Sequence, residues 1–284
     1  MKYAFYTALA ILAFAANSIF CRLALLDSNI DAASFTATRL ISGALTLVLL
    51  SSLFTQKINL NFQAKSLLPS FYLFTYAATF SFAYIALDTA TGAIILFASV
   101  QITMIVSSLL KGNKLTKLEW LGALLAISGF IALLLPNAQA PSITGLILMT
   151  IAGLAWGLYS ISGMKSSAAI ATTASNFLLT LPLAVLLLLL FSAELFLSWQ
   201  GIIYGMLSGV FASGIGYSLW YFCLPKLSAT LAAIVQLLVP VIASLIGLMY
   251  EQQAMSQQVI ISFAFIGTGI LIVIFAKRYD KNGQ

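Results

Sequence analysis

The pattern of apolar residues along the chain predicts ten long helices. Each apolar run is about the length that a helix needs to cross the hydrocarbon core of a bilayer, and short charged or turn-rich breaks separate the runs. The breaks are too short to fold independently, and they force consecutive helices to run antiparallel. We therefore expect an all-α membrane protein. The runs cover residues 3–26, 32–55, 66–87, 89–110, 118–136, 143–164, 168–191, 199–224, 227–250 and 256–276.

The second half of the chain reads as a repeat of the first. Thr230–Glu251 aligns with Gly92–Asn113 at a shift of 138 positions, and each segment leads into another apolar run. Each half holds five runs, an odd number, so the second half enters the membrane with opposite polarity. We predict two inverted five-helix repeats, 1–136 and 143–277, followed by a short cytoplasmic tail, 278–284. Inverted repeats are typical of secondary transporters.

The basic residues predict the orientation. If the N-terminus is cytoplasmic, every lysine or arginine in a connecting segment falls on the inner side, and the outer segments hold acidic residues only. Positive residues gather on the cytoplasmic side of membrane proteins, so we expect both termini to be cytoplasmic in a bacterial cell inner membrane. The inner residues are Lys2, Lys57, Lys65, Lys111, Lys114, Lys117, Lys165, Lys226, Lys277, Arg278 and Lys281.

Composition narrows the function classes. The chain is 62% hydrophobic and 7% charged, against about 25% charged residues in soluble domains. Its net charge of +6 is spread over short loops, so we expect no nucleic-acid partner. Histidine is absent, and Cys21 and Cys223 lie inside apolar runs without a partner motif. We predict no metal, no cofactor and no enzyme activity, because paired carboxylates and an activated nucleophile are also lacking.

Several short motifs resemble the drug/metabolite transporter superfamily, and within it the ten-helix EamA-type exporters. They are Ala155-Trp156-Gly157, Arg39-Leu40, Pro240 followed by Glu251, and the pair Gly122 and Gly129. In the first half, Phe14-Ala15, Ile102 and Asn113 replace the Trp-Gly, proline and glutamate of the pattern. The resemblance covers essentially the whole chain. It implies a central cavity lined by the first, third, fourth, sixth, eighth and ninth runs, and export of small metabolites, amino acids among them.

Polar residues near the middle of the apolar runs are candidates for substrate binding. Asn17, Gln101, Trp156 and Gln236 fall near the bilayer centre, where a polar side chain is costly unless it finds a partner or water. Amides both donate and accept hydrogen bonds, which suits a zwitterionic or neutral polar ligand. The alternative for the amides is hydrogen bonding between helices, and Trp156 is either cavity wall or packing.

The third run adds an aromatic candidate surface. Tyr72, Tyr76 and Thr79 share one helical face. If that face points inward, it offers stacking and hydroxyl contacts to a planar or amphipathic substrate. Packing or lipid contact is the other interpretation.

Arg39 lies within the second run, and an arginine inside a membrane is a candidate functional residue. It could bind a substrate carboxylate through two hydrogen bonds, or pair with Asp27, Asp31 or Asp88 near the outer surface. The resemblance favours the pairing.

Together these patterns predict a secondary transporter, exporting a small metabolite such as an amino acid by alternating access. No carboxylate lies near the middle of any run, which argues against proton coupling through a central acid. Pro240 lacks a backbone donor and is expected to kink its helix, giving a hinge. We expect the protein to be a monomer in the lipid bilayer and to bind a small-molecule substrate. The alternative is a passive channel or facilitator for small polar solutes.

Overall fold

The computed structural model describes residues 2–25, 29–54, 64–87, 89–135, 140–250 and 257–282. These residues are almost entirely helical, and their β-type pairing is confined to an isolated antiparallel bridge between Ile30 and Leu197. The α-helices are α1 (Lys2–Leu25), α2 (Ala32–Leu53), α3 (Ala64–Ala86), α4 (Thr89–Leu110), α5 (Lys117–Leu134), α6 (Ile143–Gly163), α7 (Ala169–Leu190), α8 (Trp199–Leu207), α9 (Gly216–Cys223), α10 (Ala229–Val235), α11 (Leu238–Tyr250) and α12 (Gln257–Asn282). The shorter elements are the 3₁₀ helices η2 (Ser192–Glu194) and η4 (Leu224–Lys226) and the π-helix η3 (Ser208–Ile215).

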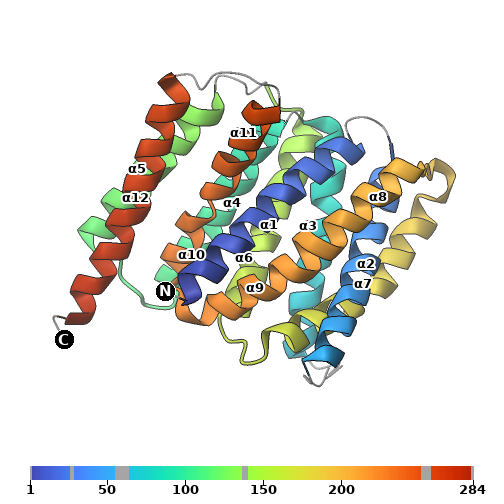
Figure 1. The fold of residues 1–284 in the computed structure, drawn as a ribbon, viewed down its shortest axis with the longest axis horizontal. Helices are drawn as coiled ribbons and strands as arrows, with labels where there is room; N and C mark the ends of the chain where they lie inside the picture. The colour runs from blue at the N-terminus through green and yellow to red at the C-terminus, as the bar shows by residue number, and fades with distance from the viewer. Residues whose placement is uncertain are drawn as a thin grey trace.

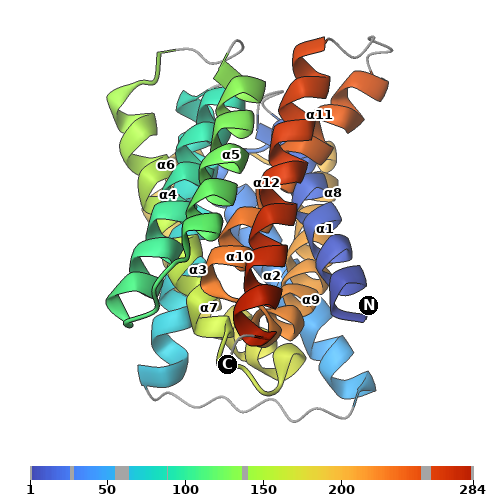
Figure 2. The ribbon, with the colours of Figure 1, turned by 90° about the vertical axis from the view of Figure 1, so that its left-hand side faces the viewer.

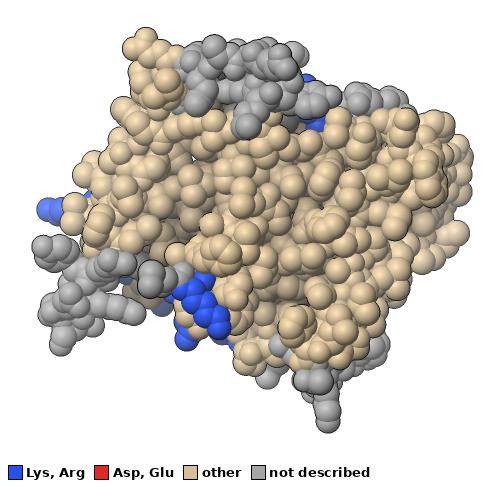
Figure 3. All heavy atoms as spheres, viewed as in Figure 1, with Lys and Arg blue, Asp and Glu red and all other residues tan. Residues whose placement is uncertain are grey.

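The surface of the bundle matches a protein that crosses a membrane several times. Seven helical segments among the described residues are long and apolar enough to span a bilayer, and two shorter apolar helices cover 229–243 and 260–276. Large apolar side chains such as Leu45 and Leu110 face outward. Figure 3 shows one face on which the few visible basic residues lie towards the edges. The prediction of an all-helical, multi-pass membrane protein is confirmed at this level.

Two predicted helices are interrupted. The run 199–224 forms α8, η3 and α9 in succession, so its middle is a π-helix. The run 227–250 is divided into α10 and α11 by a turn at Gln236 and Leu237. In addition, α12 continues to Asn282, beyond the predicted end at 276.

The two halves of the chain pack with a shared scheme (Figure 1). α5 packs along α12, and α2 packs along α7, so equivalent helices of the two halves meet. Contacts between non-equivalent helices also correspond. α3 packs on α6, and its counterpart α9 packs on α1. In the same way α4 packs on α6, and its counterpart α11 packs on α1. Each of these helices therefore packs in the second half of the chain as its counterpart does in the first.

Glycines allow α5 and α12 to approach closely. A Cβ atom at Gly122 would lie 2.7 Å from the carbonyl oxygen of Gly269, and one at Gly269 would lie 2.6 Å from the amide nitrogen of Ala126. Two turns further along, a Cβ atom at Gly129 would lie 2.9 Å from the carbonyl oxygen of Ser262. Small residues of this kind drive helix association in lipid, where no hydrophobic force distinguishes a neighbouring helix from a lipid tail.

The connection from α4 to α5 is defined by local backbone chemistry. α4 ends at Leu110, and the chain then turns at Gly112, whose positive φ of 81° suits glycine. α5 then starts with a capping box: the Thr116 hydroxyl accepts from the Glu119 amide, and the Glu119 carboxylate accepts from the Thr116 amide. The carboxylate of Glu119, which lies at the edge of a predicted run, therefore serves as a helix cap.

This cap gives a stability prediction. Thr116→Ala removes one half of the capping box, so we expect the free energy of unfolding to fall by about 0.5–2 kcal/mol. Thermal unfolding of the purified protein in detergent would measure it. Ser128→Ala is the matched control, because the exposed Ser128 hydroxyl bonds only to the Leu125 carbonyl of its own helix. Equal melting temperatures for the two variants would contradict the prediction.

Candidate functional site

A small cavity lies where six of the predicted runs meet. Its volume is about 30 Å³, room for one or two water molecules. The lining residues come from α1, α3, α4, α6, α9 and the region of the α10–α11 break, which are the six runs that the resemblance implied. They are Phe14, Asn17, Ser18, Tyr76, Phe80, Leu96, Phe97, Trp156, Tyr217, Gln236 and Val239.

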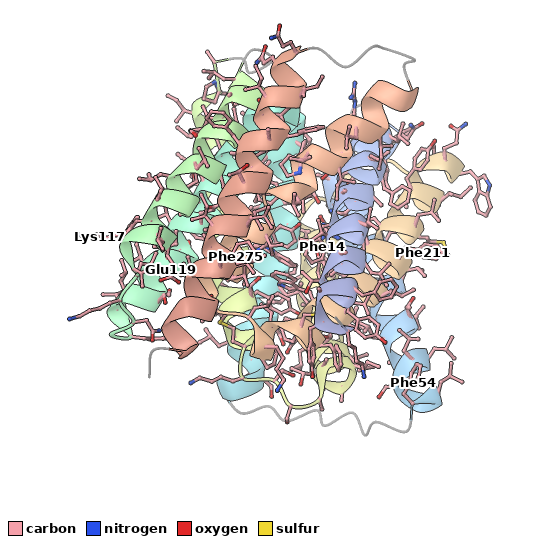
Figure 4. The ribbon with its side chains drawn as sticks, turned by 60° about the vertical axis from the view of Figure 1, so that its left-hand side comes forward. Phe14, Phe54, Lys117, Glu119, Phe211 and Phe275 are labelled. Atoms are coloured by element: carbon pink, nitrogen blue, oxygen red, sulfur yellow. The ribbon has the colours of Figure 1, made fainter. Side chains whose placement is uncertain are left out.

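Trp156 is the centre of the aromatic wall. Its ring centroid lies 4.8 Å from Tyr76, 4.8 Å from Tyr217 and 5.3 Å from Phe14. Figure 4 places Phe14 part-way along α1, in the middle of the bundle. These rings come from α6, α3, α9 and α1, so one indole joins four helices.

Glycines place Trp156 at this depth by letting α6 lie close to α4. A Cβ atom at Gly153 would lie 2.6 Å from the carbonyl oxygen of Leu96, and one at Gly157 would lie 2.8 Å from the Cβ of Thr103. Larger residues at either position would push the two helices apart. The Trp-Gly pair noted in the sequence therefore has a packing reason: the glycine brings the helix close and the tryptophan fills the space beside it.

Gln236 connects this wall to the break between α10 and α11. Its Oε1 accepts a hydrogen bond from Trp156 Nε1 at 2.6 Å. Its Nε2 donates to the carbonyl oxygen of Ala232 at 2.8 Å and approaches Met104 Sδ at 3.6 Å. The amide side chain is fully buried and is satisfied at both ends.

The break has a clear backbone cause. The Gln236 amide donates to the carbonyl of Ala233, one residue closer than in an α-helix, and the Gln236 side chain takes up the carbonyl of Ala232 instead. Pro240 has no N–H to donate to the Gln236 carbonyl, which accepts from the Val239 amide at 3.0 Å. The helix is therefore interrupted one turn before Pro240, in the region where the sequence predicts a kink.

Asn17 ties the cavity to the π-helix. It is buried, and its Oδ1 accepts a hydrogen bond from the Ser208 hydroxyl at 2.6 Å. Ser208 is the first residue of η3. π-Helical turns inside longer helices are frequent at functional sites.

Arg39 lies behind the aromatic wall and is 1% exposed. Its Nε donates to the Ser213 hydroxyl at 2.9 Å and its Nη2 donates to the Tyr217 hydroxyl. The predicted partner Asp31 has other bonds: its carboxylate caps α2 through the Ser34 amide and accepts from the Phe196 amide. The other two predicted partners, Asp27 and Asp88, lie outside the described residues.

The model of the EamA-like transporter family matches residues 1–135 and 143–275. The chain belongs to the EamA-like transporter family. The drug/metabolite transporter prediction made from the motifs is thereby confirmed. The twofold match divides the chain at nearly the same place as the predicted repeats.

Two further proteins are similar to this chain. An uncharacterized protein of Pseudomonas aeruginosa is 48% identical over 248 residues, which are 85% of this chain and 83% of that protein. A crystal structure with 17% sequence identity matches with a TM-score of 0.81 over 98% of each chain. At that identity the likeness concerns the fold alone.

The structure of this EamA-like transporter brings together four of the seven predicted site residues. Asn17, Tyr76, Trp156 and Gln236 line one cavity. Tyr72 is half-buried, one turn from Tyr76, and is not part of the lining.

Gln101 and Arg39 also stand outside the lining, and both are buried. The Gln101 side chain is 3% exposed, and neither its Oε1 nor its Nε2 has a hydrogen-bond partner.

Sequence reasoning missed two features of this transporter's cavity. Tyr217 lines it and bonds Arg39, but the Gly/Ser-rich sequence just before it, residues 205–216, indicates only close helix packing. Phe80 is one of several aromatic residues in the third run and was not among the predicted site residues. Helical spacing could have found Phe80, because it lies four residues after Tyr76 on the same face.

Proposed function

We propose that this protein is a secondary transporter that exports a small metabolite, such as an amino acid, by alternating access through the central cavity. The observation that carries the proposal is the Trp156–Gln236 pair, which lines the cavity and bonds to the backbone at a helix break. The cavity lining and a helix break thus share one side chain, that of Gln236. Family membership supports membrane transport rather than catalysis.

We further propose ten membrane spans in two inverted repeats, with both termini in the cytoplasm of a bacterial inner membrane. The repeat is supported by the packing, because corresponding helices of the two halves make corresponding contacts. In Figure 2, α1 and α6 run in opposite directions. The start of α1 and the end of α12 lie on the same side of the bundle. The lysine-bearing α4–α5 connection lies on that same side, in line with the positive-inside rule.

The size of the cavity supports a moving carrier. A volume of about 30 Å³ holds water but no amino acid. The substrate can therefore enter only if the wall moves. The α10–α11 break and the π-helix η3 both border the cavity region and are points at which a helix can bend. All the lining residues come from one chain, so we propose that the monomer is the working unit.

The lining favours an amphipathic substrate. Phe14, Phe80 and Trp156 offer apolar and aromatic surface, while Asn17 and Gln236 offer amide groups that donate and accept. This combination suits a molecule with an apolar part and a zwitterionic or polar end.

Counterflow in proteoliposomes tests the proposal. We expect saturable uptake of a labelled solute when the vesicles are preloaded with the same solute, and no dependence on an imposed pH gradient, because no described carboxylate lines the cavity. The panel would hold amino acids and nucleosides, and protein-free vesicles are the control. Flux that never saturates would contradict the carrier and favour the passive channel.

A further inference from the structure

We infer that Arg39 makes this carrier selective for substrates with a carboxylate, which the guanidinium binds when the aromatic wall opens. The inference rests on the proposed transport function and adds a substrate class to it. The cavity lining alone contains only neutral groups, so nothing in it would select an anion. The charge that could do so stands immediately behind it.

The first observation is that the Arg39 charge is buried among neutral partners. The side chain is 1% exposed, and its hydrogen bonds go to the hydroxyls of Ser213 and Tyr217. Nη1 has no partner that meets hydrogen-bond geometry. Among the described residues no carboxylate pairs with it. A buried cation without an anion is costly, and charged groups inside a membrane mark binding sites and substrate pathways.

The second observation is that the wall between Arg39 and the cavity is one side chain thick. Tyr76, Phe80 and Tyr217 all line the cavity. The same three rings lie around the guanidinium, with centroids 5.2, 5.8 and 6.0 Å from Arg39 Cζ. Each ring therefore has one face or edge towards the cavity and another towards the cation.

These contacts leave the charge of Arg39 available for a ligand. Aromatic faces stabilise a cation without neutralising it, whereas a carboxylate partner would cancel it. When the Tyr76 or Phe80 ring turns aside, Nη1 becomes available to a carboxylate in the cavity. An arginine binds a carboxylate through two parallel hydrogen bonds and distinguishes it from a neutral amide.

The test compares matched solutes on the intact carrier in proteoliposomes. The pairs are L-leucine, L-phenylalanine and L-glutamine with the corresponding amino acid amides, which lack only the carboxylate. In the wild type we expect the carboxylate form to be favoured by about tenfold or more, since hydrogen bonds to charged groups contribute at least this factor. This arm needs no variant, so misfolding cannot confuse it.

The second arm uses substitutions. In Arg39→Gln we expect the preference to fall to about threefold or less, while counterflow of the amide persists. Arg39→Lys keeps the charge but not the planar fork, so an intermediate preference is expected. Arg22→Gln is the matched control, because Arg22 lies exposed in the last turn of α1. Size-exclusion profiles and melting temperatures would establish that each variant is folded.

Two results would overturn the inference. One is equal transport of carboxylate and amide by the wild type; the carrier would stand and only the Arg39 assignment would fail. The other is a folded Arg39→Gln that keeps the full preference, or whose lost stability returns on adding Asp27→Asn or Asp88→Asn, because Arg39 would then be half of a structural ion pair. Absence of saturable counterflow for every solute would instead refute the proposed function itself.

Discussion

Replacing Gln236 with leucine is expected to slow saturable transport at least tenfold and to lower the melting temperature. Leucine has nearly the same volume but leaves two buried groups without partners, the Trp156 indole N–H and the Ala232 carbonyl. Each buried group left unsatisfied costs about 1–3 kcal/mol. The indole would no longer be held against the cavity, so we expect at least a tenfold loss in counterflow rate at equal amounts of folded protein.

The informative comparison is Gln101→Leu, the same substitution at another buried glutamine. Gln101 has no hydrogen-bond partner at either end of its amide, so leucine removes an unsatisfied group and creates none. We expect its melting temperature to rise, in the direction opposite to that of Gln236→Leu. A fall of equal size in both variants would show that burial alone, and not the bonds of Gln236, sets the effect.

The second large effect is expected at Gly209, in the π-helix η3. A Cβ atom there would lie 2.5 Å from the carbonyl oxygen of Arg39 and 3.0 Å from the amide nitrogen of Gly43, both backbone atoms of α2 that cannot rotate away. Gly209→Ala must therefore separate η3 from α2. Overpacking typically costs about 1–3 kcal/mol, and we expect the upper end of this range, with weakened contacts of Arg39 to Ser213 and Tyr217.

Gly267→Ala is the control for this prediction. Nothing lies within 4 Å of a Cβ atom at Gly267, so alanine should only improve helix propensity, by about 0.5–1 kcal/mol. The two glycine-to-alanine changes should thus shift the melting temperature in opposite directions. A Gly209→Ala protein as stable as the wild type would mean that α2 and η3 are not packed this closely.

The burial of polar residues in the middle of the apolar runs could be predicted from the sequence, but the direction of each side chain could not. Counting residues along each apolar run placed Asn17, Gln101, Trp156 and Gln236 near the middle, and all four are buried. Whether a side chain faces the cavity depends on rotation about the helix axis. Lipid and protein interior are equally apolar, so such helices carry little periodic signal, and Tyr72 and Gln101 could not be separated from Tyr76 and Gln236.

The two helix interruptions also differ in whether the sequence predicts them. The break before Pro240 could be predicted because a missing N–H is written in the residue itself. The π-helix η3 could not, since its residues, SGVFASGI, would fit an ordinary helix and only their contacts with α1 and α2 set the different register.

The two hydrogen bonds of the Gln236 side chain couple the affinity for a ligand to the conformation of the backbone. A solute that takes the Trp156 N–H competes with the Gln236 side chain, whose other end holds the Ala232 carbonyl at the break. By thermodynamic linkage, whatever factor the solute applies to the bent and straight forms of this helix, bending must apply to the affinity for the solute. A substitution at Ala232 or Pro240 that shifted the bend would thus alter the dissociation constant without touching the solute at all.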